Sequence, residues 1–174
     1  MSEANGTRVA ILIGSDSDLP VMAEAAAVLK RLGVGFELHV TSAHRSPERT
    51  TEIVRAAEAG GVRVFIAAAG CAAHLAGTVA AHTTRPVLGV PLAGSELNGL
   101  DSLLATAQMP AGVPVGTLAI GKAGAANAAW LAVGILALSD EPLARRLRQE
   151  REAMAARVAS KSEGARQKLV DLIR

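Results

Sequence analysis

Aromatic side chains are almost missing from this 174-residue chain, which has two Phe, one Trp and no Tyr. Proteins that bind single-stranded nucleic acid usually stack bases on aromatic rings, so that class loses its main physical support. Residues 144–174 carry an excess of basic side chains, and a basic tail can touch nucleic acid. We interpret these charges as the solvated face of a helix and predict no nucleic-acid partner.

Cysteine is also scarce. The single Cys71 excludes an internal disulfide and a thiolate zinc cluster, and it fits a reducing compartment. Apolar runs are interrupted before they reach the length of a membrane span, and the first six residues lack the apolar stretch of a signal peptide. We therefore expect a cytoplasmic protein without membrane contact, folded as one domain over residues 1–174.

Short apolar runs alternate with longer, alanine-rich stretches of helical character. The runs predict five buried strands, at residues 8–14, 36–41, 62–69, 86–90 and 115–120. Strands separated by helices imply right-handed crossovers and a parallel sheet covered on both faces. The predicted fold is a three-layer α/β/α sandwich with a flavodoxin-like, doubly wound, five-stranded sheet.

Residues 140–174 form a C-terminal extension beyond this sheet. Apolar residues recur there at helical spacing with arginines between them, which predicts an extra amphipathic helix. This helix can fold back on its own domain or pack on a neighbouring subunit. We expect the second arrangement, because the alanine-rich helix at residues 123–138 also suggests burial that neighbouring subunits complete.

Ligands of parallel sheets bind beyond the carboxyl ends of the strands, so the residues just after each strand are informative. After the first strand, residues 14–18 read GSDSD. Gly14 permits a sharp turn, the hydroxyls of Ser15 and Ser17 are polar contacts, and the start of the next helix favours a phosphate. Asp18 would repel a phosphate and suits a ribose diol. In the alternative interpretation, Asp18 caps the helix and the serines form a turn.

After the second strand, residues 42–47 read SAHRSP. The Arg45 guanidinium can bind a phosphate or carboxylate, and His44 can exchange protons near neutral pH. A lone surface histidine usually has no function, but the position of His44 opposite a phosphate-like loop favours one. Ser46, followed by a proline, predicts the N-cap of the next helix.

The loop after the third strand, residues 69–77, is rich in glycine and alanine. Such small side chains let the backbone approach a planar ligand closely. Cys71 is a weak candidate nucleophile because no acid–base pair is local to it. His74 is either a site residue or a helix-start residue bonded to backbone. The histidines lack the spacing of a metal site, so no metal is predicted.

Taken together, ordered motifs make the chain resemble the PurE family of N5-carboxyaminoimidazole ribonucleotide mutases, of the bacterial class I type. They cover almost the whole chain: GSDSD at residues 14–18, SAHR at 42–45, AAHL at 72–75, PVLGVP at 86–91, the run through DSLL to QMP at 99–110 and GVPVGTLAIGKAGAANAA at 112–129. Several motifs in family order are far more specific than any one of them.

The resemblance implies a mutase of purine (IMP) biosynthesis that moves a carboxyl group from the exocyclic N5 amine of an aminoimidazole ribonucleotide to ring carbon C4. The route is decarboxylation, retention of carbon dioxide in the pocket, and attack on it by the ring carbon. The resemblance implies no cofactor, since ATP and metal are not needed. It also implies a homo-octamer with sites shared between subunits, and a functional link to the synthetase that forms the carbamate.

The family's site residues transfer to matching positions in this sequence. His44 matches the catalytic histidine, which would protonate the departing nitrogen and later take the proton from C4. Ser15, Ser17 and Arg45 are expected at the phosphate and Asp18 at the ribose hydroxyls. Residues 70–75 match the segment that encloses the base and the carbon dioxide. The other expected substrate-binding residues are Ser42, Ala43, Gly70, Cys71, Ala72, His74 and Leu75.

The sequence departs from the family pattern GGAAHLPG at two positions of that segment. Cys71 replaces a glycine, and Ala76 replaces a proline. Two other functions stay open at this point. One is a class II aminoimidazole ribonucleotide carboxylase, which shares the SAHR region but departs from the AAHL loop. The other is a flavodoxin-like nucleotide-binding module without enzymatic activity.

Overall fold

The structure, a computed structural model, describes residues 6–173. Residues 1–5, on which the expectation about a signal peptide partly rests, lie outside the described residues, as does residue 174. Contacts divide the chain into two compact units, with the boundary between Leu136 and Ala137. The single domain expected from the sequence stays a prediction. None of the described helices is both long and apolar enough to cross a membrane.

The first unit is built on one parallel sheet with the strand order β2-β1-β3-β4-β5. This is the flavodoxin-like order, so the predicted fold class is confirmed. Strands β1 and β3 are fully or largely buried and read as continuous apolar runs, as strands covered on both faces do. The strands are β1 (Val9–Ile13), β2 (Phe36–Val40), β3 (Val64–Gly70), β4 (Val87–Leu92) and β5 (Gly116–Thr117).

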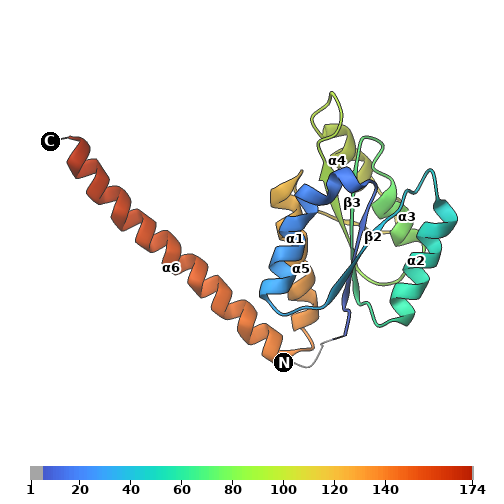
Figure 1. The fold of residues 1–174 in the computed structure, drawn as a ribbon, viewed down its shortest axis with the longest axis horizontal. Coiled ribbons are helices and arrows are strands. Elements are labelled where there is room, and N and C mark those ends of the chain that lie inside the picture. The colour runs from blue at the N-terminus through green and yellow to red at the C-terminus, as the bar shows by residue number, and fades with distance from the viewer. Residues whose placement is uncertain (1–5, 174) are drawn as a thin grey trace. The chain divides into compact units, whose positions relative to one another are not determined.

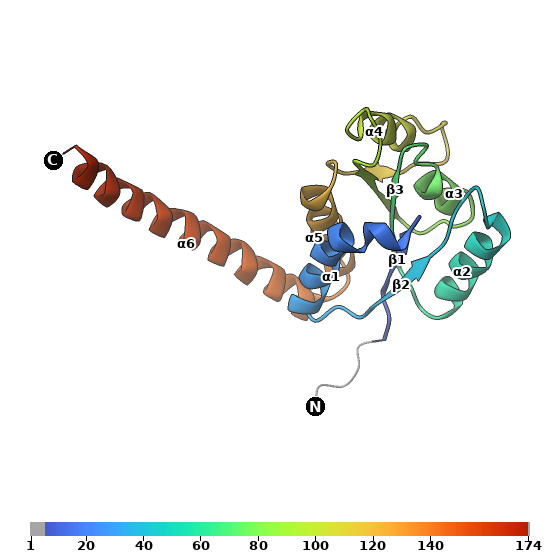
Figure 2. The ribbon, with the colours of Figure 1, turned by 45° about the horizontal axis from the view of Figure 1, so that its top comes forward.

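Helices cover both faces of this sheet, as Figures 1 and 2 show. Helices α1 and α5 lie on one face, and α2 and α3 lie on the other. The helices are α1 (Leu19–Arg31), α2 (Pro47–Ala59), α3 (Leu75–Ala81), α4 (Leu100–Ala107) and α5 (Lys122–Ala137). On the α2 and α3 face, the core joins Leu12, Val54, Phe65 and Val79, all completely buried. This packing fixes the strand ends that carry the candidate site.

Strand β5 is shorter than the sequence predicts. We expected a strand over residues 115–120, but only Gly116 and Thr117 pair with β4. The neighbouring Pro91 accepts a hydrogen bond from the Gly121 N–H through its carbonyl, so its ring nitrogen faces the same side. A proline has no N–H to donate to a ladder, and the regular pairing therefore stops there.

The second unit consists mainly of helix α6 (Glu141–Leu172). Asp140 caps its first turn by accepting the Leu143 N–H at 2.9 Å. Arg148 also stabilises the start of this helix through an ion pair with Glu141, with a nitrogen–oxygen distance of 2.8 Å. The extra C-terminal helix predicted from the sequence is thus confirmed. Its packing on a neighbouring subunit stays a prediction.

Candidate active site

The topology directs attention to the carboxyl ends of β1 and β3. Strand β1 lies between β2 and β3, so the chain leaves β1 toward one side and returns on the other. Such a switch point opens a crevice outside the strand ends, and ligands of open parallel sheets bind there. The loops after β1, β2 and β3 are the same three that the sequence identified.

The loop after β1 folds into a short 3-10 turn, Asp16–Asp18, with reciprocal capping. The Ser15 hydroxyl accepts the Ser17 N–H at 3.3 Å, and the Ser17 hydroxyl donates to it at 2.9 Å. The Asp18 carboxylate in turn accepts the Ser15 N–H at 3.0 Å. The loop therefore holds two hydroxyls and a carboxylate in fixed positions beside Gly14.

Asp18 occupies the N-cap position of helix α1, and the serines form a turn, as the alternative interpretation expects, but the Asp18 side chain makes no cap bond to the helix. Helix α1 starts at Leu19 with a proline in its first turn and has no side-chain cap bond from Asp18. The carboxylate instead turns back to the Ser15 N–H. Burial raises the pKa of the Asp18 carboxyl above its usual value, and the backbone N–H groups of Ser15 and Gly14 partly offset this rise.

The loop after β2 carries His44 and Arg45, both exposed. The Arg45 guanidinium reaches back toward the first loop, with Nη2 3.4 Å from the Gly14 carbonyl oxygen. Its backbone N–H donates to the Ser42 hydroxyl at 3.2 Å. The guanidinium thus lies beside the Ser15 loop, where hydroxyl and guanidinium donors can meet one anion.

Ser46 occupies the predicted N-cap position of helix α2. Helix α2 begins at Pro47, as predicted, but the Ser46 side chain makes no cap bond to it. The Ser46 hydroxyl accepts the Ser42 N–H at 3.1 Å and donates to the Ser42 carbonyl at 3.2 Å. It closes the loop on itself, because these local backbone groups lie within reach of a short hydroxyl side chain.

The loop after β3 brings a second imidazole to the first. His74 Nδ1 lies 2.7 Å from His44 Nε2, and the two rings meet edge to face. Sequence reasoning placed both histidines near the site but missed this contact, which joins residues 30 apart in the chain. One nitrogen must donate and the other accept, so a single proton occupies the contact.

Cys71 occupies a backbone conformation that favours glycine, with φ of 55°. This conformation explains why the family pattern GGAAHLPG has a glycine at the position of Cys71. Its thiol donates to the Gly94 carbonyl at 3.4 Å. Gly94, in the loop after β4, is a site position that sequence reasoning missed. The only signal for it was that β4 ends at the same sheet edge.

These loops enclose one cleft of about 400 Å³, a volume in the range of small-molecule sites. Apart from His74, every predicted site residue lines it, and His74 touches the lining residue His44. The lining residues are Gly14, Ser15, Ser17, Asp18, Ser42, Ala43, His44, Arg45, Ala69, Gly70, Cys71, Ala72, Leu75 and Gly94. Within residues 6–173, no cluster of three or more His, Cys, Asp or Glu could hold a metal ion.

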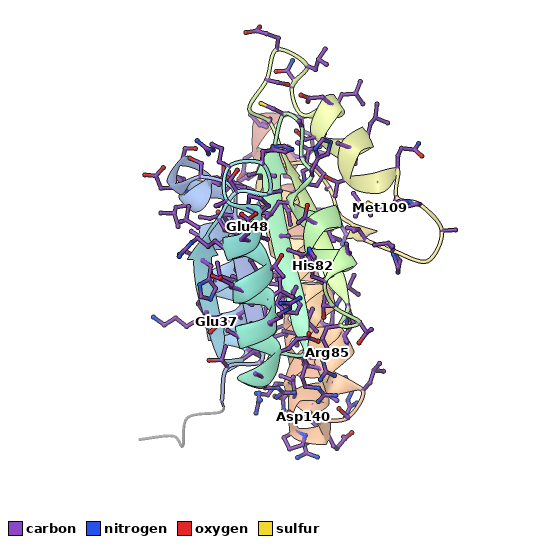
Figure 3. All side chains as sticks on the ribbon, turned by 90° about the vertical axis from the view of Figure 1, so that its right-hand side faces the viewer. Glu37, Glu48, His82, Arg85, Met109 and Asp140 are labelled. Carbon is purple, nitrogen blue, oxygen red and sulfur yellow. The ribbon has the colours of Figure 1, made fainter. Side chains whose placement is uncertain are left out.

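A second cleft, of about 550 Å³, lies at the amino ends of β4 and β5. Its charged residue Arg85 pairs with Glu58 at 3.5 Å. Figure 3 shows Arg85 near the lower end of the sheet and Glu48, in the first turn of α2, near the upper end. This cleft is larger, but the switch-point cleft is lined by the His44 imidazole, the Asp18 carboxylate and the Arg45 guanidinium, which can carry out chemistry.

Fold and cleft together define a flavodoxin-like α/β protein with a cleft of small-molecule size at the switch point of its sheet. The chain belongs to the AIR carboxylase family, whose model matches residues 8–157. A relative from Brucella melitensis is 53% identical over 153 residues, covering 88% of this chain and 94% of the relative. One from Escherichia coli K12 is 51% identical over 157 residues, covering 90% and 93%. Both are called N5-carboxyaminoimidazole ribonucleotide mutase.

A solved structure supports the fold independently. PurE of Treponema denticola superimposes with a TM-score of 0.82 at 25% sequence identity. The match covers 90% of this chain and 97% of that one.

Proposed function

We propose that the protein is an N5-carboxyaminoimidazole ribonucleotide mutase. It converts this carbamate to 4-carboxy-5-aminoimidazole ribonucleotide in purine biosynthesis, and it is therefore an isomerase. The observation that carries this conclusion is 49–53% identity to relatives of that name over most of the chain. The switch-point cleft supports it, because residues from three separate loops supply the groups that the reaction requires.

The ribonucleotide's polar end is bound on the Ser15 side of the cleft. The hydroxyls of Ser15 and Ser17 and the guanidinium of Arg45 donate to the phosphate, with the guanidinium already turned toward the Gly14 loop. The Asp18 carboxylate accepts from the ribose hydroxyls.

The chemical step exchanges one bond to the carboxyl carbon for another. The N5–carbon bond breaks, carbon dioxide is released into the cleft, and His44 gives its proton to N5. Ring carbon C4 then attacks the carbon dioxide and forms the new carbon–carbon bond. The neutral His44 imidazole then removes the proton from C4. This restores the aromatic ring and returns His44 to its protonated form.

His74, in the loop after β3, assists proton transfer by His44. Its Nδ1 at 2.7 Å from His44 Nε2 fixes one edge of the catalytic imidazole and accepts or supplies the shared proton. The small residues Gly70, Cys71 and Ala72 line the adjacent wall and leave room for carbon dioxide. A retained molecule reacts at high effective concentration, so confinement itself speeds recarboxylation.

An assay in which the carbamate is the only source of the transferred carboxyl group tests the function. In bicarbonate-free buffer, the purified protein should convert it to the C4-carboxylated product faster than an enzyme-free control. A class II carboxylase would instead need aminoimidazole ribonucleotide and bicarbonate, and a binding module would accelerate neither reaction. The name of the matching family model, AIR carboxylase, fits the class II carboxylase, but the relatives at about half identity favour the mutase. Product formation only with added bicarbonate would overturn the assignment.

Replacing Arg45 by alanine should weaken substrate binding more than turnover. Losing a charged hydrogen bond to the phosphate should raise KM about ten- to a hundredfold, with kcat changed far less. Steady-state kinetics measure the split. Arg49→Ala is the matched control, since Arg49 is also exposed but stands on helix α2 outside the cleft lining. An unchanged KM for Arg45→Ala would show that the phosphate binds elsewhere.

The remaining proposals concern assembly and setting. We propose a homo-octamer, whose association is supported by exposed apolar side chains around α4, namely Leu97, Leu100 and Leu104. In this proposal the chain is a single mutase domain. Its helical extension, residues 140–174, packs on a neighbouring subunit. A functional link to the carbamate-forming synthetase follows from the substrate's chemistry, since carbamates lose carbon dioxide readily. We place the enzyme in the cytoplasm.

A further inference from the structure

One buried hydroxyl connects helix α4 with two loops of the cleft. Ser102, on α4, is completely buried. Its hydroxyl donates to the Leu92 carbonyl at 2.9 Å and lies 3.4 Å from the Cys71 carbonyl. Leu92 ends β4, and Cys71 follows directly after β3. A side chain outside the cleft therefore reaches the backbone of two segments that form its wall.

The Cys71 segment, which Ser102 contacts, needs contacts that hold it in its conformation. Cys71 adopts a left-handed backbone conformation, which is unfavourable for any residue with a side chain. Its thiol bonds to the Gly94 carbonyl, so the β3 and β4 loops also touch one another. The Ser102 hydroxyl adds the bond that ties this pair of loops to the rigid helix behind them.

We infer that Ser102 is a positioning residue for carboxyl transfer, and this inference rests on the proposed function. It holds the Cys71 segment and the end of β4 together, so that the wall beside the carbon dioxide stays in place. If the wall loosens, carbon dioxide escapes after the N5–carbon bond breaks. N5 still receives its proton from His44, no carbon–carbon bond forms, and aminoimidazole ribonucleotide leaves as a by-product.

Thr106 on the same helix provides a matched control. It is almost completely buried, and its hydroxyl donates to the Ser102 carbonyl at 2.7 Å, within its own helix. Thr106→Val removes a buried hydroxyl from α4 without touching a cleft loop. Ser102→Ala removes the hydroxyl that does. Both variants lose one hydrogen bond, and their melting curves are to be compared with wild type to check that each is folded.

The first readout is backbone hydrogen exchange of a peptide spanning residues 70–75, in the full-length protein without ligand. Ser102→Ala should speed exchange of this peptide about fivefold, the effect of losing one net hydrogen bond on local opening. Thr106→Val should leave it unchanged. Equal exchange in the two variants would overturn the positioning role, whatever the enzyme's activity.

The second readout is how turnover divides between products. With the carbamate as substrate, Ser102→Ala should release several times more aminoimidazole ribonucleotide per carboxylated product than wild type, after subtraction of enzyme-free decay. KM should change much less than this ratio. An unchanged ratio with faster exchange would overturn the role in retaining carbon dioxide. Failure of wild type to convert the carbamate would instead overturn the proposed function and leave the exchange result standing.

Discussion

Replacing His44 by asparagine is expected to lower kcat about 10²- to 10⁴-fold, the usual contribution of a general acid–base group. Asparagine keeps a polar side chain of similar size, but its amide cannot carry a proton between N5 and C4. The serine, aspartate and arginine groups assigned to the phosphate and ribose remain. Nucleotide binding should therefore persist, and titration calorimetry with the product nucleotide measures it beside steady-state turnover.

His82→Asn is the control for that experiment. His82 is exposed at the end of helix α3 and does not line the cleft, so its replacement should leave kcat unchanged. A near-normal rate in His44→Asn would exclude His44 as the proton carrier. Lost nucleotide affinity in that variant would show that His44 binds the substrate rather than moving its proton.

The sequence predicted the loops of this site because parallel topology places them. Apolar runs alternating with helical stretches identify the strands, and every strand of a parallel sheet ends at the same edge. Gly14, His44 and Cys71 follow three such strands, and the structure brings them to one cleft. Their roles, however, came from the family resemblance, since a serine or histidine in a loop has many possible uses.

Contacts between distant side chains were not predictable in the same way. The His44–His74 pair depends on how far two loops lean toward each other, and no local pattern encodes that distance. Ser102 also gives no local signal, because a serine in a helix normally faces solvent or its own turn. The short β5 follows from Pro91 on a neighbouring strand, so its length depends on a pairing that the single strand does not reveal.

The long motif at residues 112–129 contributes to the resemblance, yet none of its residues lines the switch-point cleft. One of them, Gly124, shows a structural reason for its residue type. A Cβ at Gly124 would overlap the Ala119 carbonyl oxygen and lie 2.6 Å from the carbonyl carbon. Gly124 thus allows a close approach of the backbone at the start of helix α5.

Gly124→Ala should therefore destabilise the protein by about 3 kcal/mol or more, since backbone atoms cannot rotate away as a side chain can. Gly134→Ala is the matched control on the same helix, where an added Cβ has nothing within 4 Å. Alanine there should instead stabilise by about 0.5–1 kcal/mol, through its higher helix propensity. Urea unfolding at one protomer concentration gives both free energies of unfolding. Equal changes in the two variants would mean that the turn before α5 yields to the methyl group, and that helix propensity alone governs both positions.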